Sequence, residues 1–122
     1  MSISAALLVA EVRKVAEADP DHKQTYPDGR TLMGVYMDKM GQPSCIVGRA
    51  LHSISPEVFA LVGAEYNNQH PDSLWVKGII DGDDEEMSWL MDVQAAQDLG
   101  FPWRSAVAQA DECAKERNGV RA

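Results

Sequence analysis

Residues 83–110 read DDEEMSWLMDVQAAQDLGFPWRSAVAQA, and this stretch decides the fold. It opens with four acids, which are favoured at a helix N-terminus, and Asp83 or Asp84 can serve as the N-cap. Apolar residues then recur at helical spacing along one face: Met87, Leu90, Met91 and Ala95. Gly100 stands where a C-cap glycine belongs, and Phe101-Pro102-Trp103 turns the chain into another helix. The stretch therefore predicts two consecutive helices joined by a tight connection.

Four upstream segments also have helical features: residues 3–18, 44–54, 55–63 and 71–79. The first ends at Asp19-Pro20, because a residue before proline is disfavoured in the helical region. Ser44 is the expected N-cap of the second, and Ser55-Pro56-Glu57 opens the third with a cap and a first-turn proline. Gly63 is the expected end of the third helix, and Asn118-Gly119 that of the last.

One segment near the N-terminus has the features of a β-hairpin. Pro27-Asp28-Gly29 is a turn signal, because proline presets φ and glycine tolerates positive φ. Residues 31–37 contain threonine, valine and tyrosine, which favour strands, and residues 24–26 can pair with them across the turn. We therefore predict an α+β fold, mostly α, in which residues 1–122 form one small domain. It has about five helices and a short β-hairpin near its N-terminal third.

The charge of the chain is unevenly distributed. Its 122 residues include 11 Lys and Arg against 19 Asp and Glu, which gives a net charge of −8. Residues 1–60 hold seven acids and six bases, net −1, whereas residues 61–122 hold twelve acids and five bases, net −7. This asymmetry argues against direct binding of nucleic acid or an anionic membrane through a basic patch. No apolar run reaches the ~18 residues of a membrane span, and the first residues lack a basic n-region, so we expect a cytoplasmic protein.

The acidic residues at positions 81–92 have a spacing that partly matches a calcium-binding EF-hand loop. If Asp81 opens an EF-hand loop, Glu86 occupies the position of the glycine and Asp92 that of the bidentate glutamate. Acids at a helix N-terminus need no metal, since the helix dipole favours each by about 0.3–1 kcal/mol. Cys45 and His52 would lie about 10.5 Å apart along one helix, too far to share a zinc ion. We therefore expect no metal and no cofactor.

Cys45 is the remaining candidate for catalysis. A cysteine in the first turn of a helix can have a lowered pKa, so a small enzyme with Cys45 as its nucleophile is one alternative. No Ser/His/Asp or Cys/His arrangement accompanies it, and His22, His52 and His70 are scattered. A small buried cysteine is far commoner. We expect a protein without catalytic activity.

Residues 95–110 match the outline of a helix-turn-helix, in which Arg104 and its helical neighbours would face DNA bases. Phosphate contacts supply most of the affinity of DNA-binding proteins, yet residues 78–103 contain no Lys or Arg. An αα-corner packed by Phe101 and Trp103 fits the same pattern. A nucleic-acid-directed regulator, acting through this segment or as an acidic DNA mimic, stays the alternative function.

Aromatic and sulfur-containing residues point to an interface. The three tryptophans, together with the methionines at positions 33, 37, 40, 87 and 91, exceed what a domain of this size must bury, so we predict an interface with another protein or a homodimer. Acidic neighbours of the tryptophans favour a basic or mixed protein partner. The candidate interaction surface comprises Trp75, Asp83, Asp84, Glu85, Glu86, Trp89, Trp103 and Arg104.

The chain contains two distinctive motifs. The first is the segment PSCIVGRAL at residues 43–51, and the second is the pattern WLxxVQxAQDxGxPWxxAVxxAD over residues 89–111. They resemble motifs of small proteins encoded by actinobacteriophages, mycobacterial phages among them, and by actinobacterial genomes. The resemblance implies a phage-type, non-structural accessory protein that acts inside a bacterium, and such proteins often bind a host protein. That group often has histidine in place of Arg49, so a role of that histidine does not carry over. In physical terms the motif residues have structural roles. Cys45 belongs to the start of a helix, and Gly48 permits close packing against a neighbouring element. Gly100 and Pro102 fix the angle between the last two helices.

Overall fold

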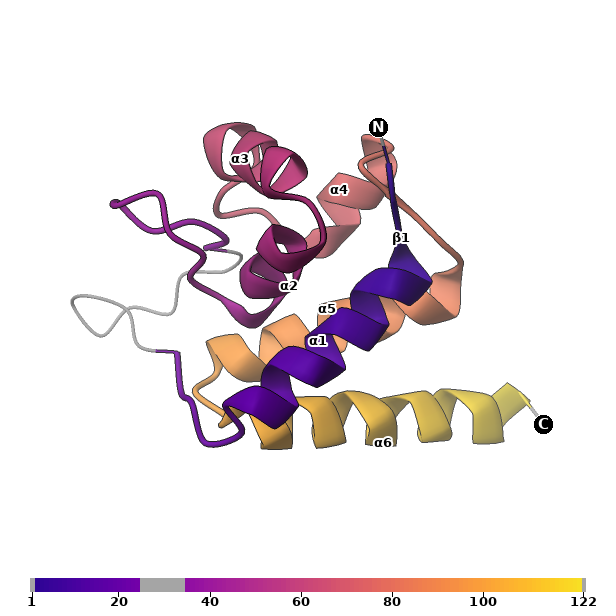
Figure 1. The fold of residues 1–122 in the computed structure, drawn as a ribbon. Helices are drawn as coiled ribbons and strands as arrows, with labels where there is room; N and C mark the ends of the chain where they lie inside the picture. Colours follow the sequence, from indigo (N-terminus) through magenta and orange to yellow (C-terminus); the bar gives the residue numbers. More distant parts are fainter. Residues whose placement is uncertain (1, 25–34, 122) are drawn as a thin grey trace.

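The structure is a computed structural model that describes residues 2–24 and 35–121. Within these ranges six helices form: α1 (Ala5–Ala18), α2 (Ile46–Ile54), α3 (Pro56–Glu65), α4 (Pro71–Val76), α5 (Asp84–Asp98) and α6 (Trp103–Arg121). Two short strands, β1 (Ile3–Ser4) and β2 (Ile80–Asp81), complete the described elements. Helices α5 and α6 lie side by side, and α1 packs against both (Figure 1). The predicted α+β, mostly α fold class is confirmed.

Helix α5 begins and ends where its sequence predicts. The carboxylate of Asp83, the N-cap, accepts the N–H of Glu86 at 2.8 Å, and the Glu86 carboxylate accepts the N–H of Asp83 at 2.9 Å. This capping box satisfies backbone donors that the helix itself leaves unpaired. Gly100 has a φ of +96° and provides the left-handed turn after the helix. Figure 1 shows α6 running back along α5 in the opposite direction, so the two form an αα-hairpin.

The core lies between α1, α2 and the α5–α6 hairpin. Leu8 of α1, Leu51 of α2 and Leu90 of α5 are fully buried in it. The core also contains a polar contact between helices: the buried Oε1 of Gln97 in α5 accepts the N–H of Ile46 at 2.8 Å. Because that N–H belongs to the first turn of α2, the glutamine satisfies a donor that the helix leaves free and joins α2 to α5.

Strand β1 comes from a segment that the sequence patterns assigned to a helix, whereas β2 directly follows the predicted helix at residues 71–79. Strand β1 pairs with β2 in parallel, with Ile3 opposite Ile80 and Ser4 opposite Asp81. The Ser4 hydroxyl accepts the N–H of Leu7 at 3.3 Å, so α1 starts at Ala5 and leaves Ile3 extended. The predicted hairpin, with a turn at residues 27–29 between strands at 24–26 and 31–37, falls mostly on residues 25–34, which lie outside the described residues.

The start of α2 differs from its prediction by one position. Cys45 is the N-cap in place of Ser44, and its Sγ accepts the N–H of Gly48 at 3.2 Å. The Ser44 hydroxyl instead accepts a hydrogen bond from Nε2 of Gln24 at 2.6 Å. Gly48 permits close packing as predicted, because a Cβ at this position would collide with the carbonyl oxygen of Tyr36.

Three predicted helix ends are wrong. Gly63 lies inside α3, where a Cβ would collide with the side chain of Met37, so this glycine permits packing rather than ending the helix. The segment predicted to be helical to residue 79 leaves the helix after Val76, and Gly78 turns the chain toward β2 with a φ of +78°. Helix α6 continues past Gly119 to Arg121, because Gly119 does not take the positive φ of a C-cap glycine.

In the part of the chain that the structure describes, no helix combines the length and the apolar character needed to cross a membrane.

Candidate functional site

The four consecutive acids at residues 83–86 have different roles at the start of α5. Asp83 and Glu86 form the capping box. Both carboxylate oxygens of Glu85 accept hydrogen bonds from Nε of Arg117, each at 3.2 Å. Asp84 is exposed and forms no ion pair with any residue that the structure describes. Of these acids, Asp84 is therefore the one whose carboxylate is available to a partner.

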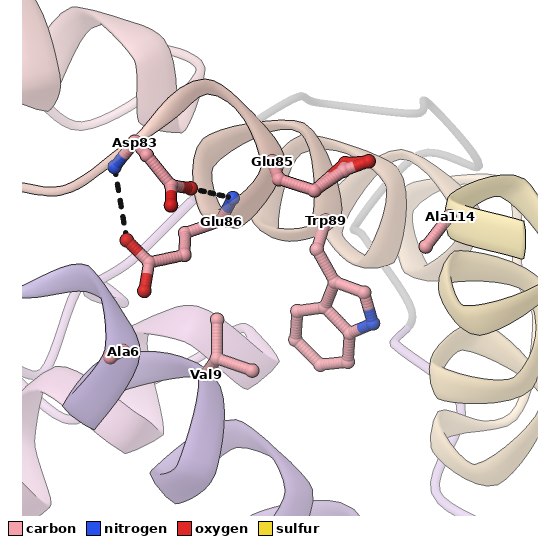
Figure 2. A pocket seen from close by; sticks show the side chains of 7 residues that line it. All are labelled: Ala6, Val9, Asp83, Glu85, Glu86, Trp89 and Ala114. Atoms are coloured by element: carbon pink, nitrogen blue, oxygen red, sulfur yellow. Dashed lines mark hydrogen bonds between the residues drawn. The ribbon is translucent and has the colours of Figure 1, made fainter. Parts of the chain in front are cut away.

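A first hollow of about 300 Å³ lies on one side of α5, between α1, α5 and α6 (Figure 2). It is lined by Ala6, Val9, Asp83, Glu85, Glu86, Trp89 and Ala114. In Figure 2 the indole of Trp89 extends from α5 toward Val9 of α1, so the ring forms a wall of the hollow. The carboxylates that line it already form the capping box or bind Arg117. The groups that remain available to a partner in this hollow are therefore mainly apolar.

Trp89 is held in place by an ion pair between the flanking helices. Its indole N–H donates to Oδ1 of Asp111 at 2.9 Å, and the guanidinium carbon of Arg13 lies 4.7 Å from the ring centroid. Hydrogen bonds from Arg13 lower the pKa of Asp111 below its usual value. Trp89 is 5% exposed, so its part in the predicted surface is limited to the wall of the first hollow.

A second hollow of about 480 Å³ lies between α4, α5 and α6. It is lined by Asp72, Trp75, Asp84, Met87, Ser88, Met91, Asp92 and Arg117. Trp75 and Met91 are half-buried, so apolar side chains are accessible at an acidic surface. With three carboxylates and one guanidinium, the lining has a net charge of −2.

Arg117 of α6 crosses toward α5 at this second hollow. Besides Glu85, it binds Asp92 through Nη1 at 2.7 Å, and the hydrogen bond to Asp92 is the main cause that raises the pKa of the guanidinium. The side chain of Arg117 is 26% exposed. The chain thus places one of its own guanidinium groups between two carboxylates, and this group lines the second hollow.

The structure brings together six of the eight predicted surface residues around the start of α5. Asp83, Glu85, Glu86 and Trp89 line the first hollow, and Trp75 and Asp84 line the second. The predicted interaction surface left out the other members of the second hollow: Asp72, Met87, Ser88, Met91, Asp92 and Arg117. Asp84, Ser88 and Met91 share the i, i+4, i+7 spacing of one helix face, which is a signal that could have found part of it.

Trp103 does not belong to the surface, and the prediction that placed it there is wrong. The side chain is 0% exposed. His22 lies against one part of the ring, with 4.2 Å between ring centroids, and the guanidinium carbon of Arg49 lies 4.7 Å from the ring centroid. The segment after α1 also binds the start of α6, since the N–H of Trp103 donates to the carbonyl of His22 at 2.9 Å. These contacts cover the indole and make it part of the core.

Arg104 lies apart from both hollows. It forms an exposed ion pair with Asp21 at 3.2 Å, so it too is separate from the acidic start of α5. Because α5 and α6 run alongside each other in opposite directions, the geometry favours an αα-hairpin over the crossed helices of a helix-turn-helix (Figure 1).

Cys45 is unsuited to nucleophilic chemistry. Its side chain is fully buried, and burial raises the pKa of the thiol to about 12. At neutral pH the group is a thiol that accepts the N–H of Gly48 as a helix cap. Among the residues described, no cluster of three or more His, Cys, Asp or Glu side chains could hold a metal ion.

Comparison of the chain with protein-family models, curated proteins and solved structures finds no match. The interpretation of the two hollows therefore rests on their geometry and charge. Such an arrangement can bind a partner through apolar contact and ion pairing.

Proposed function

We propose that this protein acts without catalysis, by binding another protein through the surface around the two hollows, here called the α5 face. The observation that supports this proposal most directly is the second hollow, where Trp75 and Met91 are accessible among carboxylates. Tryptophan and methionine are enriched in the centres of protein interfaces, and charged groups are typical of the rim. The α5 face combines both features at the second hollow, where side chains of α4, α5 and α6 meet.

The resemblance to small actinobacteriophage proteins suggests where the partner is found. In this proposal the protein is a phage-type, non-structural accessory protein in the cytoplasm of a bacterial host, and its partner is a host or phage protein. An acidic face can also occupy the DNA site of a DNA-binding protein. A DNA mimic of this kind, which is one form of the alternative function, would use the α5 face. Direct binding of DNA through residues 95–110 would use a different surface.

Site-specific photo-crosslinking in host cells tests the proposal. A photoreactive amino acid is introduced at Asp84, on the α5 face, and separately at Glu57, an exposed acid in the first turn of α3. We expect a discrete cross-linked protein product from position 84 and none of the same size from position 57. No product from position 84, or the same products from both positions, would contradict binding through the α5 face. Retardation of DNA in a gel by the purified protein at low salt would favour direct nucleic-acid binding instead.

A further inference from the structure

We infer that the second hollow, between α4, α5 and α6, binds a cationic amphipathic segment of the partner protein, with one large apolar side chain inserted between Trp75 and Met91. The inference rests on the proposed function and names the chemistry of the partner for the same face. Its first support is size: a volume of about 480 Å³ lies within the ~300–1,000 Å³ range of small-molecule binding sites. Such a volume admits a leucine or a larger apolar side chain.

The second support is the distribution of charge among the side chains that line the hollow. Asp72 lies in the first turn of α4 and Asp84 in that of α5, so carboxylates approach the hollow from two different helices. Both are exposed, and neither forms an ion pair within residues 2–24 or 35–121. A segment with cationic residues on both sides of a central apolar residue matches this arrangement, and a single small cation does not.

The third support comes from Arg117, a lining residue of the hollow whose guanidinium already binds carboxylates. Glu85 and Asp92 bind its guanidinium with distances of 2.7–3.2 Å. The same kind of group on a partner can bind the remaining carboxylates, Asp72 and Asp84. Arginine suits such positions because its planar group forms directed hydrogen bonds to carboxylates.

The first hollow is the weaker candidate for this segment. Its carboxylates are already engaged, because Asp83 and Glu86 cap α5 and Glu85 binds Arg117. A cation entering there would compete with contacts that hold the fold. At the second hollow the free carboxylates gain a partner without loss of an internal one.

The test uses the full chain and a synthetic amphipathic helical peptide built of leucine and lysine. Two control peptides carry glutamate in place of lysine, or serine in place of leucine. Calorimetry measures affinity, and NMR follows the indole N–H signals of the three tryptophans. We expect only the leucine–lysine peptide to bind, with a shift of the Trp75 signal and an unchanged signal of the buried Trp103. Equal binding of the glutamate peptide or the serine peptide, or a shift confined to Trp89 or Trp103, would overturn the inference.

Matched variants test the role of the carboxylates. The pair Asp72→Asn and Asp84→Asn removes two first-turn acids at the hollow, and the pair Glu57→Gln and Glu65→Gln removes two exposed acids of α3. We expect the first pair to weaken peptide binding about threefold to tenfold, with less effect as salt rises, and the second pair to leave it unchanged. Equal effects of the two pairs would overturn the inference.

Two further outcomes separate this inference from the proposed function. A cellular cross-link from position 84 together with no binding of the leucine–lysine peptide would overturn the inference and leave the proposed function standing. Self-association of the chain that Asp72→Asn and Asp84→Asn abolish would identify a second copy as the occupant, and would also overturn it. Peptide binding at Trp75 with no cellular cross-link would support the chemistry of the hollow and contradict the proposed cellular role.

Discussion

The guanidinium of Arg13, on α1, donates two hydrogen bonds to the carboxylate of Asp111, on α6, at 3.0 and 2.7 Å. The two residues are 98 positions apart in the sequence. The same carboxylate accepts the indole N–H of Trp89, on α5. One ion pair therefore joins three helices and positions the ring that forms a wall of the first hollow.

Removal of the Asp111 carboxylate should weaken the fold. In Asp111→Ala, Arg13 loses its partner and the indole N–H of Trp89 loses its acceptor. We expect the free energy of unfolding in urea to fall by about 1–2 kcal/mol, because a largely buried donor is left unpaired while the ion pair itself is partly exposed. Glu112→Ala, at the exposed neighbouring position on α6, is the control and should stay within about 0.5 kcal/mol of the parent protein. A loss no larger than that of the control would contradict this role.

The same pair predicts a pH dependence of stability. Hydrogen bonds from Arg13 lower the pKa of Asp111 in the folded state below its ordinary value of 3.8. A lowered folded-state pKa contributes stability above the unfolded pKa, and this contribution disappears as the pH falls through the folded pKa. The difference in unfolding free energy between the parent protein and Asp111→Asn should therefore be constant near neutral pH and shrink below pH 3.8. Denaturation series over this range check the prediction, and a difference that does not shrink would contradict it.

Gly48 and Gly119 should respond in opposite ways to the same substitution. A Cβ at Gly48 would meet the backbone of Tyr36, whereas Gly119, inside α6, has nothing within 4 Å. We expect Gly48→Ala to lower the free energy of unfolding by about 1–3 kcal/mol, since the backbone must move. Gly119→Ala should be neutral or stabilising by up to about 1 kcal/mol, because alanine favours helices. Chemical denaturation of both variants makes the comparison, and equal effects would refute the close approach at Gly48.

The two cysteines should differ in reactivity. Cys45 is buried with a pKa raised to about 12, whereas Cys113 is partly exposed on α6. A disulfide reagent at neutral pH should label one thiol per chain quickly under native conditions, and both thiols in urea. In Cys113→Ser the fast phase should disappear. Rapid native labelling of that variant would show that Cys45 is accessible.

Replacement of Arg117 should lower stability and raise the affinity for the leucine–lysine peptide. In Arg117→Gln, Glu85 and Asp92 lose their cation, and the net charge of the second hollow changes from −2 to −3. We expect a loss of about 0.5–1.5 kcal/mol in unfolding free energy and about threefold tighter peptide binding. Calorimetry at low salt measures the affinity. Weaker binding would show that Arg117 contributes to the bound state in another way.

Local sequence patterns predict the start and end of α5 because their causes lie within a few residues. Asp83 and Glu86 cap the helix across three positions, and Gly100 supplies the turn directly after it. Patterns of this kind do not predict the β1–β2 pair, because its partners lie far apart and each strand is two residues long. They also predict the wrong end for α3, since Gly63 is needed for contact with Met37 and not for termination.

The candidate site, too, was only partly predictable from local sequence. Composition and charge alone indicated an acidic surface with tryptophans near residues 83–89, and six of the predicted residues line the two hollows. Sequence could not distinguish buried Trp103 from half-buried Trp75, because a tryptophan in either place contributes to the same apolar pattern. Burial depends on what packs against the ring from elsewhere in the chain, here His22 and Arg49.

The sequence by itself determined the helical class, the boundaries of α5 and the excess of acid in the second half of the chain. Side-chain caps and helical periodicity depend on residues only a few positions apart, and net charge depends on composition alone. All three can therefore be read without knowledge of the tertiary contacts. Only the tertiary structure decided that Asp72, Asp84 and Arg117 share one hollow. Packing of α4 and α6 against α5 brings them together, because that packing buries apolar surface contributed by all three helices.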